Sequence, residues 1–549
     1  MKKLTLLAAL IVIISVLCPA ATRSKKNDIS RNLDIFNALY KELQTFYVDS
    51  IDAEKSINTA IAAMLNDIDP YTEYISVKEQ DKFRSMTTGE YGGIGSIIQQ
   101  SDEGVIIVEP YEGSPAQTAG LHPGDIFLEI DGDTVTGLTS DRVSEKLKGQ
   151  SGSTLRLKMK RPWTKGDSIL DFELKRAKIQ IPSVTYVGMA RPGIGYVSLN
   201  TFSEKSYAEV REGVEKLIKD GAKGLILDLR GNGGGLVESA VEILGLFLPK
   251  GTAVLTTRGK GVLNEKVYKT STKPIDTKIP LAVLVDGSSA SASEIVAGAL
   301  QDLDRAVVIG GRSYGKGLVQ STRELPYDGL LKVTIAKYYI PSGRLIQAID
   351  YSHRNPDGSV ARIPDSLTNV FKTAGGREVR DGGGITPDIK IEYPEVNRMT
   401  YNVVRDNWAF DFANKYAMEH DSIPAPEKFE VTDDIYAQFK GFIDPKKFNY
   451  DKVCENAVNQ LREIAKVEGY MNDSTSAEFD RLAALLKHDL DRDLDINRKN
   501  LTPYIAEEIL MRYYFKRGAA AYSLRDDEAV DSAAAILTTP RFGQILGKK

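Results

Sequence analysis

The chain has 549 residues, of which 71 are basic and 75 acidic, so its formal net charge is −4. At a typical size of ~150 residues per domain, a chain of this length cannot be packed around one hydrophobic core, and we expect three or four packed units. The near-neutral balance, without long runs of one sign, argues against a nucleic acid or another polyanion as a partner.

The first residues have the order of a secretory signal. Lys2 and Lys3 precede an apolar run from Leu4 to Leu17, and Pro19 and small residues follow. A membrane-spanning helix needs ~20 apolar residues, so this shorter run favours a cleaved signal over a retained anchor. We therefore predict a signal peptide over residues 1–21 and no integral membrane span after its removal.

The two cysteines bear on attachment and stability. Cys18 leaves lipid attachment open, but the bulky Leu17 stands where a lipidation site has a small residue. Once the leader is removed, Cys454 is the one cysteine left, so no intramolecular disulfide can form.

The pattern changes along the first third of the chain. Apolar residues at helical spacing predict two amphipathic helices, over 32–47 and 57–65, within an N-terminal helical region at 22–88. Short β-like runs separated by Gly and Asp turns follow, and they predict a compact β-rich module over 89–178.

Strand-like and helical runs alternate in the next segment, from about 193 to 339. This alternation is typical of βαβ units and predicts a largely parallel sheet covered by helices, within a domain at 179–394. Residues 395–549 are mostly helical by their spacing, and we predict a C-terminal helical domain there. Its two apolar faces are formed by Phe479, Leu482, Leu485 and Leu486, and by Ile505, Ile509, Leu510 and Tyr513.

Several hydroxyl groups stand where a buried strand is predicted to turn into a helix. Ser289, Ser291 and Ser293 follow the apolar run that ends at Val285. A nucleophile at a helix start lies beside free backbone N–H groups that can stabilise a negative charge. The alternative is that these serines cap and solvate the helix start.

A second glycine-rich loop follows the next predicted strand and places Lys316 between Gly315 and Gly317. The glycines allow a sharp bend, and a buried lysine has its pKa lowered, so its amine can accept a serine proton at neutral pH. Gly310, Gly315 and Lys316 also have the spacing of a phosphate-binding loop. That loop requires Ser or Thr after the lysine, so Gly317 argues against nucleotide binding.

The motifs of residues 67–392, taken jointly, resemble those of the C-terminal processing peptidases, also called tail-specific proteases. The matching segments are Asp69-Pro-Tyr-Thr-Glu-Tyr, Tyr91-Gly-Gly-Ile-Gly, Leu121-His-Pro-Gly-Asp, Leu227-Asp-Leu-Arg-Gly-Asn-Gly-Gly-Gly, Ser289-Ala-Ser-Ala-Ser-Glu, Tyr314-Gly-Lys-Gly, Pro341-Ser-Gly-Arg-Leu-Ile-Gln and Gly384-Ile-Thr-Pro-Asp. The resemblance implies a multidomain α/β and α+β protein, with a crotonase-like or Clp-protease-like catalytic core and an inserted-type PDZ domain.

The resemblance also implies roles for single residues. Ser291 corresponds to the nucleophile, Lys316 to the general base, and Gln320 to the residue that orients the lysine amine. The oxyanion hole is implied at the N–H groups of Ala292 and of a glycine in the Arg230–Gly235 turn. We place that second donor at Gly235, with Gly234 as the alternative.

The β-rich module resembles a PDZ domain, with Gly92, Gly93, Ile94 and Gly95 as its carboxylate-binding loop. Such domains add an extended peptide as a strand and hold its terminal carboxylate on backbone N–H groups. We therefore expect protein or peptide substrates with accessible C-termini. The module tethered before the core is also expected to gate access to the cleft.

Other chemistries have weaker support. None of the four histidines lies in the motifs around Ser291 and Lys316, and His122 lies in the Leu121–Asp125 turn of the β-rich module, which argues against a histidine base. Neither His-Glu-x-x-His nor a cysteine cluster is present, so we expect no metal and no cofactor. The acidic run at 491–497 resembles a calcium loop, but Ile496 stands where such a loop has glycine, which favours a solvated acidic face.

The sequence thus predicts an exported serine endopeptidase of the bacterial periplasm or cell envelope. The alternative is a catalytically silent PDZ scaffold that binds peptides. The C-terminal helices could serve oligomerisation, a substrate vault or an adaptor, and the sequence leaves these roles open.

Overall fold

The computed structural model describes residues 28–162, 168–261, 265–351, 355, 359–393 and 395–547. The predicted signal peptide and Cys18 lie outside these residues. The chain divides into two compact units, one formed by 1–76 with 320–333 and the other by 77–319 with 334–549. In the part of the chain that is described, no helix is both long and apolar enough to cross a membrane.

The first unit contains the two predicted N-terminal helices. One covers 28–46, and the other is α2 (Ala53–Asn66), where Asp52 caps the helix by accepting a hydrogen bond from the Lys55 N–H. Strand β1 (Glu73–Ile75) pairs antiparallel with the first residues of β18 (Leu330–Tyr339). Asp69 holds the turn before β1, because its Oδ1 accepts hydrogen bonds from the N–H groups of Tyr71 and Thr72.

The predicted β-rich module opens the second unit. Its main sheet has the order β3-β4-β5-β7-β8, with β6 beside β5, so β3 is an edge strand of that sheet. The core is formed by inward-facing side chains such as Ile107, Phe127 and Met159. The elements are β2 (Glu90–Gly93), β3 (Ser96–Ser101), β4 (Gly104–Pro110), α4 (Pro115–Thr118), β5 (Ile126–Ile130), β6 (Asp133–Thr134), α5 (Ser140–Leu147), β7 (Thr154–Arg161), β8 (Ser168–Lys175) and β9 (Ala177–Gln180).

A six-stranded sheet with the order β10-β11-β12-β15-β16-β21 follows. All its neighbouring strands are parallel except β10 and β11, which confirms the predicted βαβ architecture. Its strands are β10 (Val184–Arg191), β11 (Ile194–Leu199), β12 (Gly224–Asp228), β15 (Leu281–Val285), β16 (Val307–Gly310) and β21 (Ile389–Lys390). The helices between them are α6 (Ser206–Lys219), α7 (Val237–Leu244) and α8 (Ala292–Asp302).

Helices cover both faces of this sheet. Alternate side chains of a strand point to opposite faces, so Leu225 and Leu227 of β12 pack with α6, α7 and α8, whereas Ile226 packs with α16 (Glu528–Leu537). The second face is thus covered by a helix from the last residues of the chain. The sequence pattern placed that helix in the C-terminal region without indicating this contact.

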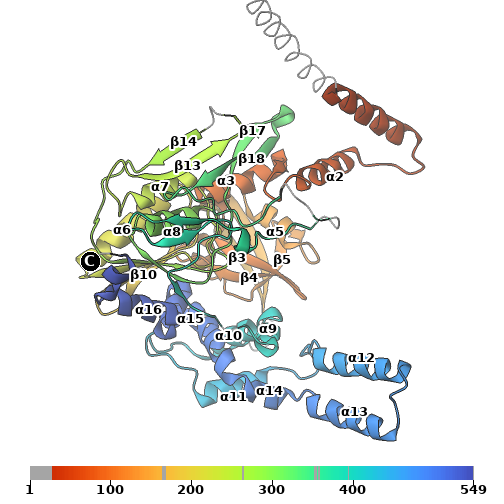
Figure 1. The fold of residues 1–549 in the computed structure, drawn as a ribbon. Helices are drawn as coiled ribbons and strands as arrows, with labels where there is room; N and C mark the ends of the chain where they lie inside the picture. Colours follow the sequence, from red (N-terminus) through yellow and green to blue (C-terminus); the bar gives the residue numbers. More distant parts are fainter. Residues whose placement is uncertain are drawn as a thin grey trace, which may run out of the picture. The chain divides into compact units, whose positions relative to one another are not determined.

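Five of the remaining C-terminal helices, α9, α10, α11, α14 and α15, form their own core around Phe412, Phe439 and Ile509. Helices α12 and α13 form a hairpin (Figure 1), and on α13 the predicted apolar face is largely open, with Leu485 68% exposed. The acidic run is helical, as α14. The elements are α9 (Arg398–Arg405), α10 (Trp408–Glu419), α11 (Asp433–Phe442), α12 (Val453–Val467), α13 (Asp473–Leu486), α14 (Leu490–Ile496), α15 (Arg498–Ser523) and α17 (Arg541–Ile545).

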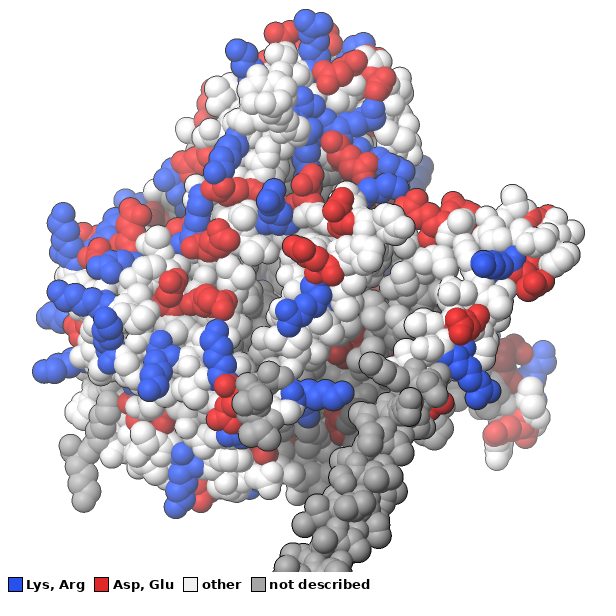
Figure 2. Space-filling model, turned by 90° about the horizontal axis from the view of Figure 1, so that it is seen from above, with Lys and Arg blue, Asp and Glu red and all other residues white. Residues whose placement is uncertain are grey.

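Acidic and basic side chains are interspersed on the face drawn in Figure 2. That face carries no broad patch of one sign, in agreement with the charge balance of the sequence.

Candidate active site

The candidate site lies where β15 ends and α8 begins. The turn after Val285 is closed by Asp286, whose Oδ1 accepts hydrogen bonds from the N–H groups of Ser288 (2.9 Å) and Ser289 (3.0 Å). The Ser289 hydroxyl donates to the Leu229 carbonyl at 2.7 Å. Ser289 is therefore a structural residue that connects this turn to the end of β12.

Ser291 has a backbone conformation that L-residues rarely adopt, with φ 56° and ψ −113°. Such a conformation costs on the order of 1–3 kcal/mol and persists only where the surroundings enforce it. It places a half-buried serine directly before the first residue of α8. The surroundings that enforce it come from two side chains, Glu294 and Tyr338.

Glu294 is fully buried and accepts four hydrogen bonds. Its Oε2 accepts from the backbone N–H groups of Ser291 and Lys316, each at 2.9 Å. Its Oε1 accepts from the Ser313 hydroxyl at 2.5 Å and from the Gly315 N–H at 2.7 Å. Burial raises the pKa of Glu294 to about 7, while these hydrogen bonds act in the opposite direction. One carboxylate thus holds the backbone of both sequence-predicted catalytic residues.

Tyr338, also fully buried, joins the same two residues on their carbonyl side. Its one hydroxyl proton is shared between two acceptors, the Lys316 carbonyl oxygen and the Ser291 carbonyl oxygen, the latter at 3.2 Å. Glu294 and Tyr338 together fix the peptide groups on which the Ser291 and Lys316 side chains are mounted. The two segments are therefore joined by two buried side chains.

The glycines around Lys316 are required by close packing. Gly315 has φ +90°, and a Cβ there would lie 2.3 Å from the Cβ of Ala348. A Cβ on Gly317 would lie 2.8 Å from the Gln347 N, and the Gly317 N–H donates to Gln347 Oε1 at 2.7 Å. The Pro341–Gln347 motif thus packs against the lysine loop through Gln347.

The turn that follows β12 lies against Ser291. The Asn232 carbonyl accepts hydrogen bonds from the Ala290 N–H (3.0 Å) and the Ser293 hydroxyl (2.8 Å). A Cβ on Gly234 would lie 2.8 Å from the Ser291 Cβ. The Gly234 N–H donates to Asn232 Oδ1 at 2.8 Å, whereas no hydrogen bond is found from the Gly235 N–H within the described residues.

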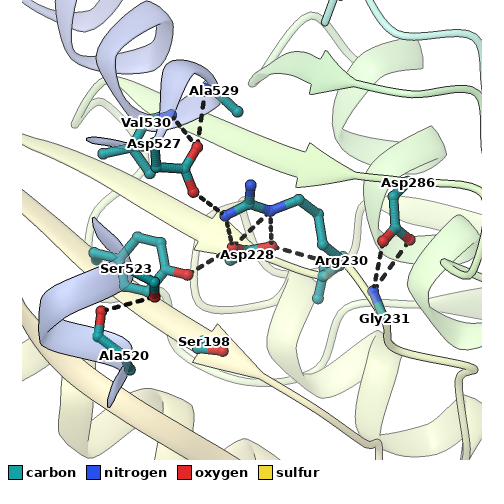
Figure 3. A network of polar contacts seen from close by, with 12 residues as sticks. Ser198, Asp228, Arg230, Gly231, Asp286, Ala520, Ser523, Asp527, Ala529 and Val530 are labelled. Atoms are coloured by element: carbon teal, nitrogen blue, oxygen red, sulfur yellow. Dashed lines mark hydrogen bonds and ion pairs between the residues drawn. The ribbon is translucent and has the colours of Figure 1, made fainter. Parts of the chain in front are cut away.

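A charged network anchors the start of this turn (Figure 3). Arg230 contacts both Oδ atoms of Asp228 and, through Nη2, Oδ2 of Asp527 at 2.7 Å. Tyr196 donates its hydroxyl proton to Asp228 at 2.6 Å. Gly231 donates its N–H to both carboxylate oxygens of Asp286, each at 3.1 Å. The network joins strands β11, β12 and β15 to the beginning of α16.

The PDZ-like module has a small cavity of about 60 Å³ beside its glycine loop. Gly93 at the end of β2, Ile94 after it and Ser96 at the start of β3 line one side, and Leu147 and Lys148 line it from the end of α5. The predicted loop is thus part strand, because Gly92 and Gly93 pair with β9. Gly92 cannot carry a side chain, because a Cβ there would lie 2.1 Å from the Gly149 carbonyl oxygen. The predicted carboxylate loop therefore lies next to a cavity at the free edge of a sheet.

The predicted residues are brought together to different degrees. Ser291 and Lys316 share the contacts of Glu294 and Tyr338, and Ala292 follows Ser291 directly in the chain. The turn that ends at Gly235 adjoins Ser291 and Ala292 through Gly234. Gln320 lies on β17 (Leu318–Glu324) and belongs to the first unit, so its role as the residue that orients the lysine stays a prediction.

Sequence reasoning assigned no role to Glu294, Tyr338 or Arg230. Glu294 could have been found, because a glutamate three residues after a serine at a helix start is the capping-box pattern, in which the glutamate binds the serine N–H. Tyr338 has no such signal, because its contacts cross large distances in the sequence.

Three profiles of known domain families match the chain. Residues 76–160 match "PDZ domain", residues 193–357 match "Peptidase family S41", and residues 399–537 match "Probable PDZ-protease, C-terminal helical domain". These matches follow the order of the predicted domains.

Known proteins match over most of their length. The carboxy-terminal-processing protease of Bartonella bacilliformis is 34% identical over 370 residues, which cover 66% of this chain and 83% of that protein. A probable CtpA-like serine protease of Staphylococcus haemolyticus is 31% identical over 430 residues, which cover 77% of this chain and 84% of that protein. Among solved structures, the photosystem II D1 C-terminal processing protease is 28% identical, with a TM-score of 0.36, over 65% of this chain and 86% of that one. The family profiles and the two sequence relatives confirm the resemblance drawn from the motifs, and the chain belongs to peptidase family S41, among the C-terminal-processing serine proteases that carry a PDZ domain.

Proposed function

We propose that this protein is an exported endopeptidase that cleaves peptide bonds through an acyl-enzyme, with Ser291 as nucleophile and Lys316 as general base. The observation that carries this proposal is the shared anchoring of the two residues by Glu294 and Tyr338. A catalytic pair requires fixed mutual geometry, and effective molarity falls steeply when reacting groups are displaced. A scaffold that merely bound peptides would not need this anchoring.

In the proposed reaction, the neutral Lys316 amine takes the proton of the Ser291 hydroxyl as Oγ attacks the scissile carbonyl carbon. The tetrahedral intermediate collapses, the C–N bond breaks, and Lys316 returns the proton to the leaving amine. A water molecule then attacks the ester carbonyl and gives a proton to Lys316; the C–Oγ bond breaks, Lys316 returns the proton to Ser291 Oγ, and the new carboxylate leaves. Gln320 is proposed to orient the amine through its side-chain amide.

For the oxyanion, we propose the N–H groups of Ala292 and Gly235. Ala292 is the first residue of α8, so its N–H has no partner within the helix. The Gly234 N–H is occupied by Asn232 Oδ1, which favours Gly235 over its neighbour. Loss of one such donor lowers kcat by about 10²–10³ in other serine proteases.

The PDZ domain is proposed to select substrates by their C-termini. Strand β3 has a free edge in its sheet, which can pair with an extended peptide, and the glycine loop can accept the terminal carboxylate on its N–H groups. Lys148 lines the cavity and adds a positive charge near that loop. A peptide with a free C-terminus should therefore bind more tightly than the same peptide with a C-terminal amide.

Export to the periplasm or cell envelope is proposed from the first 21 residues alone. Fractionation of cells that express the full chain tests this: the processed protein should appear in the envelope fraction, and an uncut chain in the cytosol would contradict export.

The proposed activity is tested with an unfolded substrate protein and four versions of the full chain. The parent should cleave the substrate, whereas Ser291→Ala and Lys316→Ala should reduce the rate by at least a thousandfold. Ser288→Ala is the matched control, because Ser288 is an exposed serine in the same turn. A silent scaffold predicts no cleavage by any version while the C-terminal peptide still binds.

A further inference from the structure

Asp527 connects the last part of the chain to the peptidase site. It is the N-cap of α16, and its Oδ1 accepts hydrogen bonds from the N–H groups of Ala529 (2.9 Å) and Val530 (3.2 Å). Its other oxygen, Oδ2, accepts the 2.7 Å hydrogen bond from Arg230 Nη2. The two residues are 297 positions apart in the sequence, and both side chains are largely buried.

Arg230 is fixed between two carboxylates. On one side Asp228 contacts its backbone N–H at 2.8 Å and its guanidinium, and on the other side Asp527 contacts the guanidinium (Figure 3). Asp228 belongs to β12 and stays in place with the sheet. Asp527, by contrast, caps α16, which comes after helices α9 to α15 of the C-terminal region in the chain.

The residue after Arg230 begins the turn that is proposed to hold the oxyanion. From Gly231 the backbone runs through Asn232, which binds Ala290 and Ser293 on both sides of Ser291, to Gly235. A rotation of the Arg230 backbone would therefore tilt the donors of this turn relative to Ser291.

We propose that Asp527 is a positioning residue of the peptidase. Its carboxylate holds Arg230, and through Arg230 it fixes the direction of the oxyanion turn at 231–235. The C-terminal region thereby completes the active site without touching the substrate. This inference rests on the proposed function, because it assigns Asp527 a part in that reaction.

The alternative is that Asp527 merely stabilises the packing of α16 on the sheet. The chain offers a control for this alternative on the same helix, with a side chain more exposed than that of Asp527 (59% against 14%). Asp531, one turn later on the same helix, forms an ion pair with Arg191 at 2.7 Å, and Arg191 belongs to β10, away from the oxyanion turn. Both ion pairs join α16 to the sheet. Of the two, the Asp527–Arg230 pair is the one that adjoins the turn in contact with Ser291.

The test compares Asp527→Asn with Asp531→Asn in the full chain. Asn caps a helix about as well as Asp, so Asp527→Asn keeps the bonds to Ala529 and Val530 and weakens the contact to Arg230. The measurements are kcat and KM on an internally quenched peptide, the inhibition constant of a peptide boronate that forms a tetrahedral adduct on the serine, and the melting temperature. Titration with the boronate counts the folded active sites. Dividing the rate by this number, and not by total protein, keeps unfolded protein from lowering kcat.

We expect Asp527→Asn to lower kcat about tenfold, a fraction of the effect of losing an oxyanion donor. The boronate should bind more weakly by a similar factor, and KM should change less than twofold. Asp531→Asn should leave these three constants unchanged, and Asp527→Glu, which restores the carboxylate, should recover part of kcat.

A kcat of Asp527→Asn within twofold of that of Asp531→Asn would overturn the inference, and so would a loss of kcat with unchanged boronate affinity. Parent and Ser291→Ala are measured in the same assay. If the parent cleaves no faster than Ser291→Ala, the proposed function fails. If that difference is present but Asp527→Asn behaves as Asp531→Asn does, the inference about Asp527 alone is wrong.

Discussion

The carboxylate of Glu294 accepts a hydrogen bond from the backbone N–H of Lys316, 22 residues further along the chain. The same oxygen accepts from Ser291, so a displacement of this carboxylate would move the proposed nucleophile and the proposed base together. Backbone N–H groups can only donate, so the ionised form of Glu294 is the one that satisfies this arrangement.

Glu294→Gln should therefore lower kcat about a hundredfold at pH 8, comparable to the loss of a preorganised electrostatic contact. The amide has one acceptor oxygen in place of two, and its NH₂ group would face N–H donors. Steady-state kinetics with the internally quenched peptide measure this effect. The control is Glu238→Gln, an exposed glutamate in the first turn of α7.

The effect should shrink as the pH falls. Burial raises the pKa of Glu294 to about 7, so below that pH the parent also carries a neutral side chain at this position. A ratio of parent to variant kcat that is the same at pH 8 and pH 6 would contradict this assignment.

Glu507 of α15 should make stability depend on pH. Burial and the neighbouring charge of Glu508 raise its pKa to about 7, above the usual 4.5. The folded state therefore binds the proton more tightly than the unfolded state, and this stabilising contribution, present below about pH 4.5, is lost as the pH rises to about 7.

Replacing Glu507 by Gln should raise the melting temperature at pH 8 and leave it nearly unchanged at pH 4.5. Glu508→Gln should lower the melting temperature at pH 8, because Glu508 pairs with the buried Arg512 at 2.8 Å. Thermal unfolding followed by circular dichroism measures both. If Glu507→Gln shifted the melting temperature equally at pH 8 and pH 4.5, ionisation of the buried Glu507 would not be the cause of the pH dependence.

The PDZ domain is docked on the C-terminal helices, and this contact should control its mobility. Lys516 pairs with Glu109 at 3.1 Å, Arg517 pairs with Glu112 at 3.1 Å, and Phe410 packs against Ile106 of β4. Glu109→Lys places two positive charges in contact and should loosen the docked domain. Hydrogen exchange should then increase in 104–110 and 511–517.

The double variant Glu109→Lys with Lys516→Glu restores an ion pair of reversed polarity and should return exchange toward the parent value. If gating by the PDZ domain holds, the single variant should also change the cleavage rate, and the double variant should restore it. Exchange in the single variant that matches the parent would show that this contact does not hold the domain.

The sequence predicted the order of the domains and the parallel sheet, because alternating strand and helix patterns and the glycine-rich turns are local signals. It also indicated Ser291 and Lys316 through the motifs around them. Glu294 lies within one of these motifs, and its spacing from Ser291 is a capping signal, but its contacts to the lysine loop have no local signal. The contacts of Asp527 and Tyr338 were not predictable, because they join segments that the sequence does not relate. The packing of α16 on the sheet was missed for the same reason.

The central claim is that Ser291, activated by Lys316, is acylated by the substrate. It is tested most directly by mixing the full chain with a peptide ester, quenching with acid within milliseconds, and mapping the adduct by mass spectrometry. We predict an acyl group on the peptide that contains Ser291 in the parent, and none in Ser291→Ala or Lys316→Ala. An adduct on another residue, or cleavage by Ser291→Ala at the parent rate, would contradict the claim.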